Sequence, residues 1–402
     1  MVVCPAGFDS IEVGAAVTRV LHVALSLQPG GTERLIVELA KRLHRDVPAA
    51  VCCLDVAGAW ASELTTRGIH VTALGRAPGF RPALGRAVSR VAHQHGATVL
   101  HAHHYSPFVY SCLARLTRPS LRVVFTEHGR LGDTGPSPKR RLANTILARL
   151  ADAVCAVSED VRQHLIGEGF ASSAVGIVYN GIEPGTAPDP AARARQRAAL
   201  GIADRVLVVG TIARLDRVKD LGTLIRAVAL AAQARPVELL IIGDGPERAH
   251  LTQLAARESG SAPVRFMGHL DDARAWLAGC DVYANSSLTE GISLTILEAM
   301  AAALPIVATR AGGTPEVIDE TCGRLVAPRN PEAMADTIRA LGVDARLRQT
   351  LGAAARRRVC DRFALDRMVA EYRQVYEGTR AAAGAVAART RHPRDRHIPR
   401  VR

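Results

Sequence analysis

Short apolar runs alternate with amphipathic helical patterns along most of the chain, and this alternation limits the fold more than any other feature of the sequence. The run RVLHVALS is typical of a buried strand, and TERLIVELAKRLH is typical of an amphipathic helix. Further apolar runs follow, each separated from the next by a helical pattern: AAVCCLDV, HVTAL, ATVLHAHH, RVVFTEHG and DAVCAVSE. Apolar strands joined by helices indicate a parallel sheet with helices on both faces.

The alternation stops near Pro184 and then starts again. The segment EPGTAPDPAARARQR contains three prolines and no apolar period, so we interpret it as a linker. A second series begins at RVLVVGTIA and continues through ELLIIGDG, VRFMG, DVYANS, PIVATRAGG and GRLVAP. We therefore predict an α/β fold with two Rossmann-like, doubly wound parallel-sheet domains, residues 1–186 and 187–362, facing a central cleft. Ligands of such sheets bind beyond the carboxyl ends of the strands, so we expect the ligand in this cleft.

The remaining segments and the composition exclude several classes of protein. Residues 363–378 have a helical pattern that we expect to pack back on the first domain, and residues 379–402 are basic and predict a disordered tail. No run approaches the roughly 18 apolar residues that span a bilayer. Asp9 and Glu12 interrupt the apolar stretch that a signal peptide would need, so a cytoplasmic location is expected. Eight scattered cysteines without a C-x-x-C pair favour buried free thiols over disulfides or a zinc site.

The charge predicts an anionic partner. The formal net charge is +13, and only three of the 51 basic residues are lysines, so each lysine invites a local explanation. A nucleotide sugar, an acidic lipid surface and a nucleic acid would all suit this charge. Aromatic residues make up only 4% of the chain and are not interleaved with the basic residues, so no nucleic acid is expected.

Two loops that follow predicted strands carry groups suited to phosphate. In QPGGTER, Gly30 and Gly31 allow the backbone to approach a ligand, and the next helix offers free N–H groups to an anion; a plain tight turn is the alternative. In GTIARLDRVKD, Arg214 and Lys219 lie around a turn and would neutralise a pyrophosphate leaving group. A solvated pair of surface charges is the alternative for the second loop.

The segment LTEGISLTILEAMAAALP places two carboxylates on either side of a predicted helix start. Glu290 lies in the loop before the helix and Glu298 about two turns into it, among apolar neighbours. The first turn of a helix has N–H groups without intrahelical partners. Carboxylates accept from hydroxyls and amides bind phosphate, so the segment suits a polyol joined to a pyrophosphate. The residues expected to contact this ligand are Glu290, Gly291, Ile292, Ser293, Leu294 and Glu298.

Two other motifs point away from cofactors. IIGDGPERAHL lacks the third glycine of a dinucleotide-binding loop because Arg248 occupies its place. HAHH, with His101, His103 and His104, resembles a metal cluster, but strand alternation divides its side chains between two faces and no carboxylate is adjacent. We interpret these histidines, His103 among them, as strand-end residues that line the cleft. No cofactor and no metal are expected.

Taken together, these motifs resemble the retaining glycosyltransferases of family 4, which have the two-domain GT-B fold. Glu290 and Glu298 match the family's E-x-x-x-x-x-x-x-E signature, and PGGTER, TEHG, VYNGIEP, GTIARLDRVKD, GDGPE and PIVATRAGGTPEVI stand around it in family order. The resemblance covers about residues 19 to 378. It implies an acceptor-side first domain, a nucleotide-sugar-binding second domain and a UDP-, GDP- or ADP-sugar as donor substrate.

The resemblance also assigns roles to residues. Glu298 would bind the ribose, Glu290 the donor sugar, and Arg214 with Lys219 the pyrophosphate, while the Gly30–Gly31 loop would close on phosphate or acceptor. Further positions matched by the family are His128 beside the donor sugar, Asn180 near the domain junction, and the backbone of Gly268 and His269 beside the base. Ser293 replaces a frequent glycine and would narrow the sugar pocket. No D-x-D triplet stands at a strand end, so a metal-bridged pyrophosphate has no support.

These implications define the expected function. The chain would move a hexose-type sugar to a hydroxyl acceptor by front-face attack, in glycolipid, exopolysaccharide or cell-envelope glycan synthesis. Arg130, Lys139, Arg140 and Arg141 precede or begin an amphipathic helix, which suits a lipid-linked acceptor and peripheral contact with an anionic membrane at the inner face of the cell membrane. A solvated basic loop is the alternative there. A nucleotide-sugar epimerase of the same layout and a nucleic-acid-binding protein are the rival functions.

Overall fold

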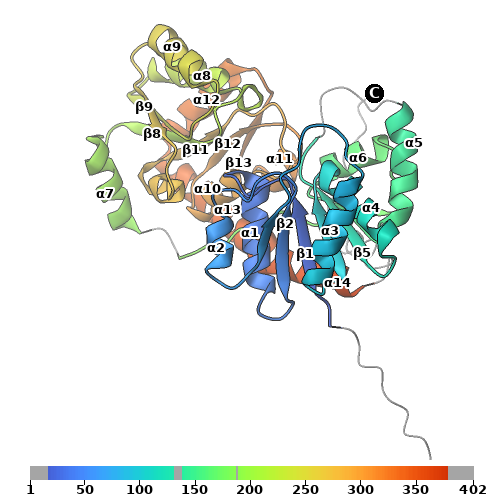
Figure 1. Cartoon of the computed structure of the whole chain (residues 1–402). Helices are drawn as coiled ribbons and strands as arrows, with labels where there is room; N and C mark the ends of the chain where they lie inside the picture. Colours follow the sequence, from blue (N-terminus) through green and yellow to red (C-terminus); the bar gives the residue numbers. More distant parts are fainter. Residues whose placement is uncertain (1–16, 131–137, 187–188, 379–402) are drawn as a thin grey trace, which may run out of the picture.

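Two parallel β-sheets form the framework of the protein (Figure 1). The computed structural model describes residues 17–130, 138–186 and 189–378. The first sheet has seven strands in the order β3-β2-β1-β4-β5-β6-β7, and the second has six in the order β10-β9-β8-β11-β12-β13. The order reverses beside β1 in one sheet and beside β8 in the other, as in doubly wound folds. The predicted pair of doubly wound sheets is therefore confirmed.

The first sheet extends over the first series of apolar runs. Its strands are β1 (Val20–Ala24), β2 (Ala49–Cys53), β3 (Val71–Ala73), β4 (Val99–His103), β5 (Arg122–Glu127), β6 (Ala153–Ala156) and β7 (Val175–Ile177). The connecting helices are α1 (Gly31–Leu43), α2 (Ala61–Thr65), α3 (Ala83–Gln94), α4 (Tyr105–Thr117), α5 (Pro138–Leu147), the short 3-10 helix η1 (Ala148–Leu150) and α6 (Glu159–Gly167). Strand β1 is central: Val20 lies opposite Ala49 of β2 and Val99 of β4.

The second sheet extends over the second series. Its strands are β8 (Leu207–Ile212), β9 (Val237–Ile242), β10 (Val264–Gly268), β11 (Val282–Asn285), β12 (Ile306–Thr309) and β13 (Gly323–Val326). The helices are α7 (Pro190–Leu200), η2 (Arg217–Lys219), α8 (Leu221–Ala232), α9 (Arg248–Glu258), η3 (Ala273–Gly279), α10 (Leu294–Ala301), α11 (Thr314–Val317), α12 (Pro331–Val343), α13 (Ala345–Arg362) and α14 (Leu365–Glu377). No helix within the described ranges is long and apolar enough to cross a membrane.

The linker prediction is wrong for its second half, which forms helix α7. Asp189 caps this helix by accepting a hydrogen bond from the backbone N–H of Ala191 at 2.9 Å. Pro190 occupies the first helical position, where a missing N–H costs nothing. Gly201 ends the helix in the left-handed conformation, with φ of 66°. The Asp-Pro pair before an alanine- and arginine-rich run was therefore a helix-start signal that the absence of an apolar period concealed.

Helix α14 belongs by sequence to the end of the second domain but packs against the first sheet. Its buried side chains recur at helical spacing and face β1, β4 and β6. They are Leu365, Met368, Val369, Tyr372, Val375 and Tyr376.

The chain crosses between the two domains near Ile182 and again near Phe363–Leu365, and the two crossing segments run side by side. The backbone N–H of Ile182 donates to Phe363 at 3.0 Å, and that of Leu365 donates to Ile182 at 2.7 Å. A methyl group on Gly181 would lie 2.7 Å from the carbonyl oxygen of Ala364, so this close approach needs a glycine.

Some sequence predictions concern the thiols and the ends of the chain. Six of the seven cysteines in the described part of the chain are buried, and Cys360 is exposed. The predicted tail, residues 379–402, and the start of the chain, residues 1–16, which we did not expect to be a signal peptide, lie outside the described residues, as does most of the basic loop, residues 131–137.

Candidate active site

The acidic segment Glu290–Glu298 lies between the end of strand β11 and helix α10, at the carboxyl edge of the second sheet. Glu290 accepts from Lys219 Nζ at 2.7 Å and from Ser287 Oγ at 2.7 Å, both on Oε1. The backbone of the Lys219 turn is tied to the same loop, because Ser286 Oγ donates to the Lys219 carbonyl at 2.8 Å. The lysine and the carboxylate are thus positioned as a pair by two neighbouring strand ends.

The N-terminus of α10 lies next to this pair. Ser293 occupies the N-cap position, but its side chain makes no capping hydrogen bond and lies 3.2 Å from Thr295 Oγ1 instead. The first amides of an uncapped helix remain available to an anion. Leu294, in the first turn, lies across the cleft from the glycine pair: a methyl group on Gly31 would be 4.0 Å from its Cδ1. The glycine loop and the start of α10 therefore lie close together.

Glu298 lies further along α10, with apolar residues on either side. Burial raises the pKa of its carboxyl group to about 7, and the positive charges of Arg274 and Arg34 only partly oppose this effect. Arg34 comes from α1 of the first domain, so its influence places Glu298 near the other wall of the cleft. This carboxyl group is poised to gain or lose a proton near neutral pH.

Arg214 does not join the Lys219–Glu290 pair. Its guanidinium binds Asp216, with Nη2 at 2.6 Å from Oδ2, and its side chain is 72% exposed. Arg214 nevertheless lies close enough to Glu33 of α1 to lower the pKa of that carboxyl group, against the larger opposite effect of burial. It therefore stands at the mouth of the cleft, and gripping a pyrophosphate together with Lys219 would require its release from Asp216.

The two domains are in contact behind the acidic segment. A methyl group on Gly291 would lie 2.2 Å from the carbonyl oxygen of His128, and one on Gly313 would lie 2.7 Å from Ser158 Cβ. Gly313 also donates its backbone N–H to the Glu290 carbonyl at 3.0 Å. His128 is thus brought beside Glu290 by backbones that approach as closely as glycine allows.

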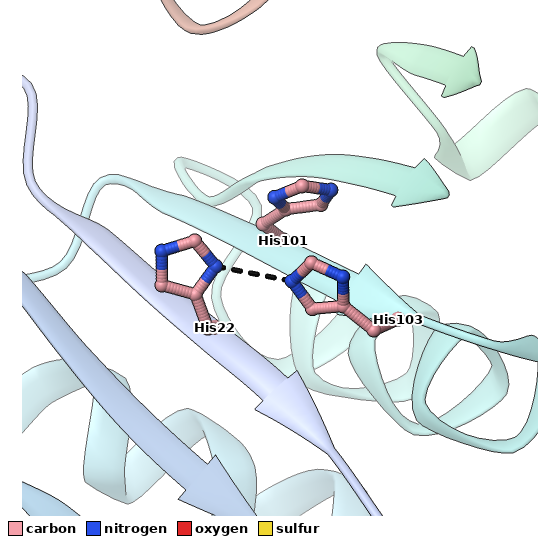
Figure 2. Close-up of side chains that lie close together, drawn as sticks. All are labelled: His22, His101 and His103. Carbon is pink, nitrogen blue, oxygen red and sulfur yellow. Dashed lines mark hydrogen bonds between the residues drawn. The ribbon is translucent and has the colours of Figure 1, made fainter. Parts of the chain in front are cut away.

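A chain of buried imidazoles leads from β1 to His128. His22 Nδ1 lies 3.1 Å from His103 Nε2, as Figure 2 shows, and His103 Nδ1 lies 3.1 Å from His128 Nε2. His101, stacked near His103, bonds Tyr376 through Nδ1 at 2.7 Å and Thr126 through Nε2 at 2.8 Å. The expectation that the HAHH histidines line the cleft is wrong for His101 and His103, which are 0% and 2% exposed.

Burial keeps these imidazoles neutral. It lowers the pKa of His22 to about 3 and the pKa values of His101, His103 and His128 well below the ordinary range, and neighbouring imidazoles add to the effect at the last three. In a neutral chain, each imidazole donates once and accepts once, so the tautomer of His22 determines whether His128 presents an N–H or a bare nitrogen. Nδ1 of His128 and Nε2 of His22, the two ends of this chain of imidazoles, have no hydrogen-bond partner among the described residues.

His22, His101 and His103 bring ring nitrogens within 4.8 Å of one another, a spacing compatible with a metal ion. Hydrogen bonds already engage both ring nitrogens of His101, with Tyr376 and Thr126, and both of His103, with His22 and His128. The group consists of imidazoles alone, and a metal ion would have to displace these hydrogen bonds. The hydrogen-bonded chain accounts for this cluster better than a metal ion does.

His104 turns the opposite way and joins the cleft. It adopts φ of 74°, bonds Glu127 Oε1 through Nδ1 at 2.8 Å, and reaches Thr32 of the glycine loop through Nε2 at 3.0 Å. Burial would lower the pKa of His104, but the hydrogen bond and charge of Glu127 outweigh it and raise that pKa. Glu127 also accepts from the backbone N–H of His128 at 3.0 Å. An imidazole whose pKa is raised by Glu127 therefore lies between the glycine loop and His128.

The remaining predicted positions lie at the edges of the cleft. Asn180 donates through Nδ2 to the carbonyl oxygen of Ile292 at 3.0 Å, which ties the first crossing to the start of α10. Gly268 ends β10 with φ of 72° and accepts from Gly243 at 2.8 Å. His269 is 60% exposed and lies 3.8 Å from Asp271.

Sequence reasoning missed Ser287, Glu127, Glu33 and His22. The first two adjoin predicted site residues and carry the hydrogen-bonding groups that a support for Glu290 and His128 requires. His22 could not be found from its neighbours in the sequence, because its contact depends on β1 pairing with β4.

Comparison with known structures defines the class of protein first. HepE of Anabaena, solved in complex with UDP, aligns with a TM-score of 0.79 and 25% identity over 90% of this chain and 100% of that one. The two-sheet layout is the GT-B fold of glycosyltransferases, as predicted.

The sequence comparisons then identify the family. A model described as Glycosyltransferase Family 4 matches residues 29–186, and one described as Glycosyl transferases group 1 matches residues 203–344. The GDP-mannose-dependent alpha-(1-6)-phosphatidylinositol monomannoside mannosyltransferase of Mycolicibacterium smegmatis is 30% identical, over 66% of this chain and 72% of its own. The D-inositol 3-phosphate glycosyltransferase of Salinispora arenicola is 29% identical over 91% of both chains. This chain belongs to glycosyltransferase family 4 and is an enzyme that transfers sugar.

Proposed function

We propose that the enzyme moves a hexose-type sugar from a UDP-, GDP- or ADP-sugar to a hydroxyl acceptor with retention of anomeric configuration. The observation that carries this proposal is the Lys219–Glu290 pair, whose charged atoms lie 2.7 Å apart beside the uncapped N-terminus of α10. The next residue, Gly291, packs closely against the His128 backbone of the other domain. The structure of HepE, solved as a complex with UDP, supports a nucleotide donor. Glycolipid, exopolysaccharide or cell-envelope glycan synthesis would be the context.

The chain's residues then divide the chemistry. Amides at the start of α10, together with Lys219 and a released Arg214, stabilise the negative charge that develops on the departing diphosphate. Glu290 accepts hydrogen bonds from hydroxyls of the donor sugar, Glu298 from the ribose, and the neutral His128 contacts the sugar across the cleft. The acceptor oxygen attacks the anomeric carbon from the face that the phosphate leaves, and that phosphate oxygen takes the acceptor proton. No metal is required in this scheme.

The pair can be tested with the substitutions Glu290→Gln and Lys219→Gln. Each keeps the size of the side chain and removes one charge, so we expect transfer to fall by about 100-fold or more because charge stabilisation is lost in the transition state. A thermal-shift screen of UDP-, GDP- and ADP-sugars identifies the donor, and product analysis with cell-extract acceptors measures transfer.

Arg217→Gln on the same turn is the matched control, since its side chain is 92% exposed. Unchanged turnover in both test variants would refute the site. An epimerised nucleotide sugar formed without any acceptor would favour the epimerase alternative instead.

We also propose that helix α5 makes peripheral contact with an anionic membrane that carries a lipid-linked acceptor. Leu142 and Ile146 are 66% and 56% exposed on this helix, one turn apart, and Lys139 and Arg141 are exposed beside them. Arg130 and Arg140 are paired with Asp160 and Glu168, so they contribute less free charge than the sequence predicted. An apolar strip with basic neighbours suits an interfacial helix.

Cosedimentation with vesicles of phosphatidylcholine, with and without phosphatidylglycerol, tests this contact. Binding to the anionic vesicles at low salt should fall at least about threefold in a Leu142→Ser/Ile146→Ser variant, because apolar area no longer enters the interface. Leu116→Ser, at an exposed position of α4, is the control. Absence of binding by the unmodified protein would remove the proposal.

A further inference from the structure

A cavity of about 630 Å³ lies in the first domain, beyond the carboxyl ends of strands β2, β3 and β4. This size falls within the range of small-molecule sites. Its walls come from the end of β2, the loop after β3 and the first two turns of α4. They are Asp55, Arg76, Pro78, Gly79, Phe80, Tyr105, Ser106, Val109 and Tyr110.

The cavity adjoins the catalytic cleft. Tyr105 and Ser106, two of its walls, directly follow His104, which bonds Thr32 of the glycine loop at 3.0 Å. The His104 ring also lies edge-on to the His128 ring, with centroids 5.2 Å apart. A ligand in the cavity would therefore lie next to the groups that face the donor sugar.

One wall of the cavity is aromatic. Phe80 stacks on Tyr110 with ring centroids 6.0 Å apart, yet it remains 66% exposed. Tyr110 is itself fixed, because its hydroxyl accepts from the backbone N–H of Arg81 at 3.2 Å. The exposed ring of Phe80, which stacks on the fixed ring of Tyr110, offers a flat apolar surface that suits the C–H face of a saturated ring.

The charged groups of the cavity neutralise each other. Arg76 binds Asp55 with two hydrogen bonds, Nε to Oδ1 at 2.7 Å and Nη2 to Oδ2 at 3.0 Å. Such a two-point pair keeps spare donors on the guanidinium and spare acceptors on the carboxylate. Hydroxyl groups of a ligand both donate and accept hydrogen bonds, so they would bind the spare donors of Arg76 and the spare acceptors of Asp55. A phosphate would meet a guanidinium already occupied and a carboxylate that repels it.

We propose that this cavity binds the acceptor, and that the acceptor presents a neutral, hydroxyl-rich ring, such as a glycoside, in preference to a phosphorylated one. The inference rests on the proposed transfer function and assigns the substrate class of that site. The ring stacks on Phe80 while its hydroxyls bond the Asp55–Arg76 pair, which turns another hydroxyl toward His104 and the cleft.

Saturation-transfer NMR on the full chain tests the ring chemistry with methyl α-D-glucoside, methyl α-D-mannoside, myo-inositol and myo-inositol 1-phosphate as probes. We expect at least one neutral ring to bind, with its affinity reduced about three- to tenfold by Phe80→Ala as the stacking surface is lost. Leu116→Ala, at an exposed position on the far end of α4, should leave binding unchanged. Tighter binding of the phosphorylated probe, no binding by any probe, or no effect of Phe80→Ala would overturn the proposal.

A second variant tests the charge argument. Asp55→Asn frees Arg76 from its carboxylate, so the ratio of inositol 1-phosphate to inositol affinity should rise about tenfold or more. An unchanged ratio would contradict the role of the pair. Thermal shifts with UDP, GDP and ADP separate this proposal from the proposed function: nucleotide binding in the Phe80→Ala variant together with lost ring binding supports the cavity. Failure of all nucleotides to bind the unmodified protein would count against the transfer function instead.

Discussion

At the scale of single residues, burial decides how the site's ionisable groups behave. His128 is held neutral by burial and has its Nε2 engaged by His103, so it can offer only hydrogen bonds and no charge to a substrate. His104, one ring away, keeps a raised pKa because Glu127 binds it. The pKa values of two adjoining imidazoles are therefore shifted in opposite directions, downward at His128 and upward at His104.

Glu298 leads to a prediction about stability and pH. Burial raises the pKa of its carboxyl group from 4.5 to about 7. The stability of the folded protein that depends on this protonated carboxyl group is therefore fully present below pH 4.5 and is lost as the pH rises through about 7. The Glu298→Gln variant and the unmodified protein should therefore have similar free energies of unfolding below pH 4.5. The variant should be more stable than the unmodified protein by up to about 3 kcal/mol at pH 8.

Urea unfolding in the absence of nucleotide, between pH 4.5 and 8, measures the difference. Glu320→Gln, at an exposed position, is the control. A stability difference that does not change with pH would show that the carboxyl group of Glu298 has the same pKa in the folded as in the unfolded protein.

At the scale of elements, local signals were enough for some features and contact partners were needed for others. The Glu290–Glu298 segment could be placed from sequence, because a strand end, a loop and a helix start follow one another within it. The Lys219–Glu290 hydrogen bond could be anticipated only in outline, since it requires β8 and β11 to be neighbours. The imidazole chain could not be foreseen, because His22 and His103 meet only through the pairing of β1 with β4. Helix α7 was missed because its start signal lay in a segment without apolar period.

Helix α14 leads to a prediction at this scale. The Tyr376 hydroxyl lies 2.7 Å from His101 Nδ1, and both groups are buried. Tyr376→Phe leaves that nitrogen without a partner, so the free energy of unfolding should fall by about 1–3 kcal/mol. Urea unfolding followed by circular dichroism measures this loss.

Tyr372→Phe is the matched comparison on the same helix. Its hydroxyl lies 3.2 Å from Thr126 Oγ1, which keeps its contact with His101 Nε2 at 2.8 Å when the tyrosine is changed. A smaller loss is expected for this variant. Equal losses of unfolding free energy in the two variants would show that the hydrogen bond between Tyr376 and His101 stabilises the fold no more than the one between Tyr372 and Thr126.

At the scale of the whole molecule, the closeness of the two domains depends on glycine. Gly291→Ala would place a methyl group 2.2 Å from the His128 carbonyl oxygen in the other domain. We expect the cleft to stay more open, which increases the radius of gyration in small-angle scattering and lowers transfer at least about tenfold because the reacting groups are displaced.

Gly129→Ala is the control, because a methyl group there would meet no atom within 4 Å. Nucleotide binding to the second domain should persist in both variants. A Gly291→Ala protein as compact and as active as the unmodified enzyme would show that this contact does not govern closure.

The paired crossings at Ile182 and Phe363–Leu365 give the joint between the domains a definite mechanical character. Two strands of chain, bonded side by side, act as a doubled tether that resists stretching and sliding but still permits bending. We expect any opening of the enzyme to pivot about this pair of segments, so that closure returns His128 and Glu290 to the same alignment. A single proteolytic cut in either strand would leave the two halves attached.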